Sequence, residues 1–234
     1  MRKIGILCAS DTELAPFLSH IRGRISSERA MLTFHGGWIG QAQVTAVYSG
    51  VCKVNAAIAA QLLIDVFGVE AILNAGTAGG MDAEVALFDT IVASRMVYHD
   101  VAEDILTEFH PWLRENSFSA DPLLYAAAQA YSRKTAHPIR FGTVATGEQF
   151  IEDDRREAIH RAFAPLAVDM ETTSVAHVCY VNRIPFLSVR TVTDTADHRG
   201  LAHFEQNCAH ASARAAEVTL GILAELATHA ESQR

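Results

Sequence analysis

The chain has 234 residues, half of them hydrophobic and 20% charged, which excludes a disordered or low-complexity protein and predicts a folded domain with a sizeable core. Nineteen lysines and arginines against 27 aspartates and glutamates give a formal net charge of −8, which disfavours a nucleic acid partner and favours a small ligand. The longest apolar stretch, residues 54–74, is interrupted by Gln61, Asp65 and Glu70, so we expect no membrane span.

Cysteine usage and the first residues bear on the compartment. The apolar run after the basic pair at residues 2–3 is too short for a signal peptide. No Cys-x-x-Cys pair is present, so neither a zinc site nor a disulfide framework is predicted. We therefore expect a cytoplasmic protein with reduced, buried thiols at four widely spaced positions, Cys8, Cys52, Cys179 and Cys208.

The chain begins with a strand, a turn and a helix. An apolar strand is predicted over Lys3–Cys8, and residues 10–13 then have the Ser-x-x-Glu form of a capping box that opens a helix. Segments 31–34 and 43–48 alternate apolar and polar residues around glycines, as paired antiparallel strands do. Helical periodicity over 54–67 ends at Gly68.

Strands and helices continue to alternate beyond Gly68. A buried strand over 71–73 runs into a glycine-rich loop, residues 76–80, whose backbone amides are expected to be free. Further strands are predicted at 90–97, 139–145, 166–168 and 185–189, and further helices at 122–132, 152–162, 172–180 and 211–228. This order indicates an α/β fold: one domain over residues 1–234, a three-layer sandwich with a mixed central β-sheet flanked by helices.

In α/β sheets, ligands bind beyond the carboxyl ends of strands. Three carboxylates lie at such ends, namely Glu13, Glu171 and Asp194. Each also has a local explanation: the capping box for Glu13, a helix N-terminus for Glu171, and a turn paired with Arg190 for Asp194. The Walker, Gly-x-Gly-x-x-Gly, His-Glu-x-x-His and Gly-x-Ser-x-Gly motifs are absent, so no metal site and none of the commonest nucleotide or serine-hydrolase sites is predicted.

Seven blocks along nearly the whole chain together resemble the nucleoside phosphorylase-like superfamily. The resemblance is strongest to its hydrolytic branch, the 5′-methylthioadenosine/S-adenosylhomocysteine nucleosidases. The blocks are Ile4-Gly5-Ile6 leading to Glu13, SGVCKVN at 49–55, NAGTAGG at 74–80, Tyr98-His99-Asp100, GEQFI at 147–151, Asp169-Met170-Glu171, and residues 190–197. The resemblance implies the fold of that superfamily and a homodimer in which the loop after Asp100 completes the neighbour's site.

Cleaving a purine from ribose leaves an anionic base and gives the sugar cationic character, so a proton donor is needed. The resemblance implies that Asp194 protonates the five-membered ring of adenine. It assigns Glu13 as the base that deprotonates water on the other face of the sugar, with Arg190 and Thr77 positioning that water. Glu171 is expected to accept hydrogen bonds from the ribose hydroxyls.

The remaining contacts with the nucleoside also follow from the resemblance, which implies no cofactor. Phe150 is expected to stack on adenine, the backbone of Ile151 to read its edge, and Met170 to pack beneath the sugar. Phe204 either closes over the 5′ group or simply packs the last helix. The full set of expected binding residues is Thr77, Ala78, Gly79, Phe150, Ile151, Met170, Glu171, Thr193 and Phe204.

Hydrolysis is favoured over phosphorolysis, because related hexameric phosphorylases commonly carry an arginine where Asn74 stands. The expected reaction releases adenine from 5′-methylthioadenosine or S-adenosylhomocysteine, with 5′-deoxyadenosine and aminodeoxyfutalosine as variants. The segment after Asp100 departs from the nucleosidase pattern, which leaves the 5′ substituent open. A purine nucleoside phosphorylase and a noncatalytic nucleoside-binding protein on the same fold are the alternatives.

Overall fold

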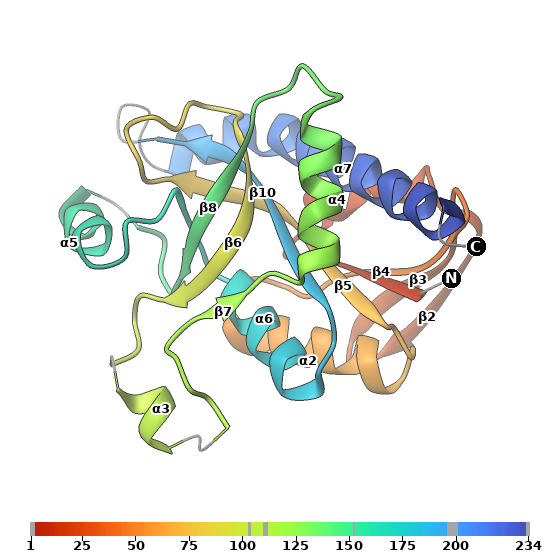
Figure 1. Cartoon of the computed structure of the whole chain (residues 1–234), viewed down its shortest axis with the longest axis horizontal. Helices are drawn as coiled ribbons and strands as arrows, with labels where there is room; N and C mark the ends of the chain where they lie inside the picture. Colours follow the sequence, from red (N-terminus) through yellow and green to blue (C-terminus); the bar gives the residue numbers. More distant parts are fainter. Residues whose placement is uncertain (1–2, 103, 110–111, 152, 196–200, 233–234) are drawn as a thin grey trace.

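The computed structural model describes residues 3–102, 104–109, 112–151, 153–195 and 201–232, in which helices pack on a central sheet (Figure 1). The strands are β1 (Lys3–Cys8), β2 (Arg22–Arg29), β3 (Leu32–Ile39), β4 (Ala42–Tyr48), β5 (Ala71–Gly80), β6 (Thr90–Tyr98), β7 (Phe118–Ser119), β8 (Ile139–Thr146), β9 (Ala167–Asp169) and β10 (Phe186–Asp194). The helices are α1 (Asp11–Leu18), α2 (Lys53–Asp65), α3 (Ile105–Phe109), α4 (Pro122–Ser132), α5 (Asp153–Phe163), α6 (Thr172–Asn182) and α7 (Leu201–Ser232).

The sheet is mixed, and part of it closes on itself. β5 pairs in parallel with β1 and β10 and antiparallel with β9. β10 continues antiparallel to β6, and β6, β8 and β9 follow in parallel pairs. These five strands form a closed circuit, while β1, β4, β3 and β2 extend from β5 as an open sheet. A mixed central sheet with flanking helices confirms the predicted α/β class.

Two apolar cores lie on opposite faces of the sheet, because successive side chains of a strand point to opposite sides. In β5, Leu73 belongs to the core beneath α1, α4 and α7, whereas Ile72 belongs to the core beneath α2 and α6. Figure 1 shows α4 and α7 on one side of the strands and α2 and α6 on the other.

The helices α1 and α4 begin where they were predicted, and capping residues close to each start explain why. Ser10 and Glu13 complete the capping box of α1. Asp121 accepts hydrogen bonds from two amides of the first turn of α4, and Pro122 occupies the first turn, where its missing N–H costs nothing. α7 begins ten residues earlier than the periodicity indicated. Glu152, the first residue of the predicted helix 152–162, lies outside the described residues, as does the end of the block 190–197.

Other elements differ from the prediction for physical reasons. Every residue of β2 is exposed, so its sequence lacks the alternation that marks a half-buried strand. Met31, expected to begin a strand, lies with Ala30 at positive φ in the turn between β2 and β3. The glycine-rich segment 76–80 is strand, not loop, because β10 and β9 pair with it. In the parts of the chain that the structure describes, no helix has the length and apolar character needed to cross a bilayer.

Candidate active site

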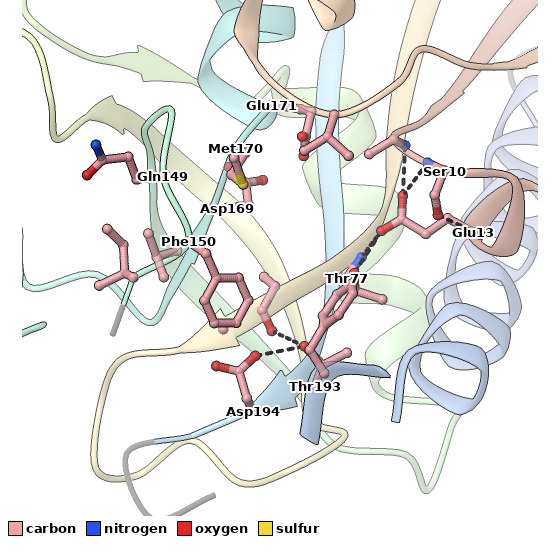
Figure 2. A pocket seen from close by; sticks show the side chains of 17 residues that line it. Ser10, Glu13, Thr77, Gln149, Phe150, Asp169, Met170, Glu171, Thr193 and Asp194 are labelled. Carbon is pink, nitrogen blue, oxygen red and sulfur yellow. Dashed lines mark hydrogen bonds between the residues drawn. The ribbon is translucent and has the colours of Figure 1, made fainter. Parts of the chain in front are cut away.

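A pocket of about 210 Å³ lies at the carboxyl ends of β1, β5 and β10 (Figure 2). Parallel strands end at one edge of a sheet, which is why residues distant in the sequence meet there. Of the residues predicted to act in catalysis or binding, all but Arg190 line this pocket. They are Glu13, Thr77, Ala78, Gly79, Phe150, Ile151, Met170, Glu171, Thr193, Asp194 and Phe204.

The Glu13 carboxylate has two sets of partners (Figure 2). Its Oε2 accepts a hydrogen bond from the amide of Ser10 at 3.3 Å, which completes the capping box, and another from the amide of Ala9 at 2.7 Å. Its Oε1 accepts hydrogen bonds from the amide and the hydroxyl of Thr77, both at 2.8 Å. The local capping role and a place in the pocket wall therefore coexist in one buried side chain.

Arg190 lies beneath the pocket and does not contribute to its wall. Its side chain is fully buried, with Nε 2.9 Å from Oδ2 of Asp169. Its Nη2 is 3.5 Å from Oε2 of Glu171, and its Nη1 is 4.0 Å from Oε1 of Glu13. The guanidinium is thus in contact with three carboxylates, those of Glu13, Asp169 and Glu171, all of which line the pocket.

Asn74, which was expected to distinguish hydrolysis from phosphorolysis, is fully buried inside β5. Its Oδ1 accepts hydrogen bonds from Nη2 of Arg190 at 2.8 Å and from the Thr172 hydroxyl at 3.1 Å. Its Nδ2 donates to the carbonyl of Leu7 at 2.9 Å. Asn74 therefore holds Arg190 in place and does not line the pocket.

Glu171 presents a carboxylate to the pocket from the residue that precedes α6. Its Oε1 accepts a hydrogen bond at 2.9 Å from the amide of Cys52, which precedes α2. Burial raises the pKa of Glu171 to about 7; the nearby Arg190 opposes this rise, and the carboxylates of Asp169 and Glu13 add to it. Glu171 therefore holds its proton to a higher pH than an exposed glutamate does.

Asp194 ends β10 and is buried, and this burial raises the pKa of its carboxyl group. Thr193 Oγ1 lies 2.9 Å from Oδ1 of Asp194 and 3.2 Å from the carbonyl of Ala78, so its single proton can go to either acceptor. A side chain at Gly79 would place Cβ 3.1 Å from Oδ2 of Asp194. Glycine at that position leaves room for the carboxyl group.

Two aromatic side chains, Phe150 and Phe204, also line the pocket. The Phe150 and Phe204 rings meet edge to face, with centroids 6.1 Å apart, and Phe150 is 39% exposed. Ile151 is buried next to Phe150, and Met170 lines the pocket between Asp169 and Glu171. The packing against Phe150 gives Phe204 a place in the pocket wall as well as in α7.

A polar clamp, which we define as Lys53, Asp100 and Glu148, fixes the loop that carries Phe150. Lys53 Nζ lies 2.9 Å from both carboxylate oxygens of Asp100. The amide of Glu148 donates to Asp100 Oδ2, and Glu148 Oε1 accepts from the amide of Lys53, each at 2.9 Å. The loop is thereby tied to the first residue of α2.

The pocket also contains residues to which sequence reasoning gave no role. Asp169 is the most important of them, since it is the carboxylate nearest Arg190 and also accepts a hydrogen bond from Thr146 at 2.6 Å. Its place in the block Asp169-Met170-Glu171 was a signal that could have identified it. The full set is Ala9, Ser10, Val51, Gln149, Val168 and Asp169.

Comparison with solved structures identifies close counterparts of this fold. The 5′-methylthioadenosine/S-adenosylhomocysteine nucleosidase of Colwellia psychrerythraea 34H, solved in complex with adenine, is 32% identical and covers 96% of each chain at a TM-score of 0.85. The futalosine hydrolase of Helicobacter pylori strain 26695 is 26% identical, with a TM-score of 0.88, over 96% of this chain and 98% of that one.

Comparison of sequences also finds relatives that match nearly the whole chain. The 5′-methylthioadenosine/S-adenosylhomocysteine nucleosidase of Staphylococcus carnosus (strain TM300) is 31% identical over 228 residues, which cover 95% of this chain and 100% of that protein. The family model of the phosphorylase superfamily matches residues 3–224. The chain belongs to the phosphorylase superfamily.

Proposed function

We propose that this protein hydrolyses the N-ribosidic bond of 5′-modified adenosines and releases adenine. The observation that carries the proposal is that Glu13, Glu171 and Asp194 line one pocket. In Figure 2 Glu13 lies at the right of the labelled side chains and Asp194 at the bottom, with Thr77 between them in this view. This separation suits a base and an acid that act on different sides of the same bond.

In the proposed reaction, the bond between the anomeric carbon and adenine breaks, and its electron pair goes to the base. Asp194 donates a proton to the five-membered ring, a role that its raised pKa supports. The oxygen of a water molecule bonds to the anomeric carbon, and Glu13 takes the proton that the water loses. Thr77 holds the Glu13 carboxylate for this step, and Glu171 accepts hydrogen bonds from the ribose hydroxyls.

Water is the proposed nucleophile because of the charges in the pocket wall. Among the described residues that line the pocket, four are carboxylates and none is lysine, arginine or histidine. A phosphate nucleophile would need cationic partners at the anomeric carbon. Release of adenine should therefore proceed in phosphate-free buffer at the same rate as with phosphate, and strict dependence on phosphate would contradict the proposal.

Asp194→Asn and Glu13→Gln test the two proposed proton transfers. Each should lower turnover of 5′-methylthioadenosine by about 10²-fold or more, measured as adenine release. Glu13→Gln should also lose about 1 kcal/mol of stability, because the capping box is damaged. Asp121→Ala is the matched control, since it removes the cap of α4 away from the pocket and should leave turnover unchanged. Near-normal turnover in either pocket variant would remove that residue from its role.

A second substrate class is supported by the similarity to a futalosine hydrolase. That class is represented by aminodeoxyfutalosine, an adenine nucleoside with a different 5′ substituent. The proposed contacts of the carboxylates with the sugar and of Phe150 with adenine would be the same for both classes. A panel of 5′-methylthioadenosine, S-adenosylhomocysteine, aminodeoxyfutalosine and inosine, each with and without phosphate, separates these substrates. Binding of the nucleosides without release of any base would favour the noncatalytic alternative.

We also propose that the chain forms a homodimer of one-domain subunits through the α2 patch, which we define as Val51, Val54 and Ile58. These side chains are 48%, 69% and 44% exposed. Val54 and Ile58 are four residues apart on α2 and so share one face of it. Val51 also lines the pocket, so a second copy seated on the patch would cover the rim of the site.

A further inference from the structure

Arg156 of α5 lies behind the carboxyl group of Asp194. Its Nη1 is 4.0 Å from Asp194 Oδ2, and the two side chains are 12% and 4% exposed. Its Nη2 donates a hydrogen bond to the carbonyl of Gly80, at the end of β5. The guanidinium is therefore held beside the carboxyl group and shielded from solvent, without being part of the pocket wall.

Asp194 is subject to opposing influences from the elements around it. Burial raises the pKa of its carboxyl group, whereas the Thr193 hydroxyl, the Arg156 charge and His203 of α7 lower that pKa. From β5, Gly79 faces this carboxyl group and carries no charge. Arg156 is the permanent charge in this set, since the charge of histidine depends on pH.

A general acid is most effective when it holds its proton near the working pH and also releases it readily. Burial alone would hold the proton on Asp194 too strongly for its transfer to the departing base. A fixed positive charge at 4.0 Å stabilises the carboxylate that remains once the proton has moved to adenine. Because of this charge, Asp194 can give up its proton while its carboxyl group stays buried.

We propose that Arg156 is a positioning residue that balances the burial of Asp194, so that this acid can both hold its proton and release it during the reaction. The inference rests on the proposed function, in which Asp194 is the proton donor. It assigns a role in the reaction to a residue of α5 that does not contact the substrate pocket.

The test compares Arg156→Met and Arg156→Lys with the wild-type protein over a range of pH. Because Arg156 favours the ionised form of Asp194, its removal should move the alkaline limb of kcat/KM upward by about one pH unit. Arg156→Lys keeps the charge and should leave the limb near its wild-type position. Arg161→Met is the matched control, since it removes the same charge from an exposed position on the same helix and should not move the limb.

A second measurement does not depend on turnover. The ¹³Cγ resonance of Asp194, assigned with Asp194→Asn, should titrate about one pH unit higher in Arg156→Met than in the wild-type protein. Unchanged titration, or a loss of activity that is equal at every pH, would overturn the role of Arg156. A protein that releases no base from any nucleoside would contradict the proposed function, and the titration would still decide the effect of Arg156 on Asp194.

Discussion

Glu171 ionises at a different pH in the folded and the unfolded chain. Burial raises its pKa from 4.5 to about 7, so the folded protein binds more protons than the unfolded chain between these values. The free energy of unfolding therefore falls as pH rises through this window, because the folded state must ionise a carboxyl group that it keeps out of water. This loss of stability is the consequence of burying the ionisable Glu171 carboxyl group in the pocket.

Glu171→Gln should remove this pH dependence. The free energy of unfolding of the variant minus that of the wild-type protein should be more favourable to the variant at pH 8 than at pH 4.5. Adenine release should fall by about tenfold or more, because the proposed acceptor for the ribose hydroxyls is weakened. Urea unfolding of both proteins at the two pH values measures the difference. Glu217→Gln, which removes a half-exposed ion pair on α7, is the control. Its free energy of unfolding should differ from that of the wild-type protein by the same amount at both pH values.

Cys52 has a backbone conformation that side chains rarely adopt. Its φ is 83° and its ψ is 162°, in a region that is nearly restricted to glycine. The conformation directs the Cys52 amide at Oε1 of Glu171. The strain is thus located where the backbone supports the pocket.

Cys52→Gly should increase stability by about 1 kcal/mol, because glycine relieves the strain. Adenine release should be retained, since the amide that binds Glu171 remains. Cys52→Ser keeps Cβ, and with it the strain, so it should show no such gain. Urea unfolding of the three proteins provides the comparison, and equal stability of the glycine and serine variants would argue against strain at this position.

At the scale of elements, the start of α2 connects the two halves of the pocket. The Cys52 amide holds Glu171, and the Lys53 amide holds Glu148 of the loop that carries Phe150. The polar clamp of Lys53, Asp100 and Glu148 adds an ion pair to this connection. Its side chains are about a quarter exposed, so solvent weakens the pair, and its main effect should be on the position of the loop.

Asp100→Asn should therefore raise KM for the nucleoside by roughly 3- to 10-fold and change kcat little. The reason is that the loop would remain in place less often, while the acid and the base would be unaffected. Steady-state kinetics separate the two constants. Glu225→Gln, which breaks the Lys134–Glu225 ion pair elsewhere on the molecule, should leave both constants unchanged. A fall in kcat with unchanged KM in Asp100→Asn would contradict this role.

The elements that were predicted correctly are those with local signals. Ser10 and Asp121 cap their helices through contacts within a few residues, and the sequence alone carries that information. β2 could not be predicted, since its strand conformation depends on pairing with β3. The contacts of Asp169 with Arg190, and of Arg156 with Asp194, join segments that meet only in the folded sheet, and therefore the residue pattern did not indicate them.

At the scale of the whole molecule, the α2 patch should control assembly. Val54→Asp introduces a charge into an apolar surface and should convert the proposed dimer to a monomer, with a several-fold rise in KM because the rim at Val51 loses its cover. Size-exclusion chromatography with light scattering measures the mass. Leu123→Asp, at a 61% exposed position on α4, is the matched control. A wild-type protein that is monomeric at micromolar concentration would contradict the proposal.

The length of α7 has a practical consequence. Its early residues include Phe204 at the pocket, and its 32 residues extend for about 48 Å at the usual rise of an α-helix. Its far end is therefore remote from the pocket. Anchoring the protein to a solid support through that end should leave the pocket facing the solution, which would suit a reusable biosensor for the nucleosides of the proposed reaction.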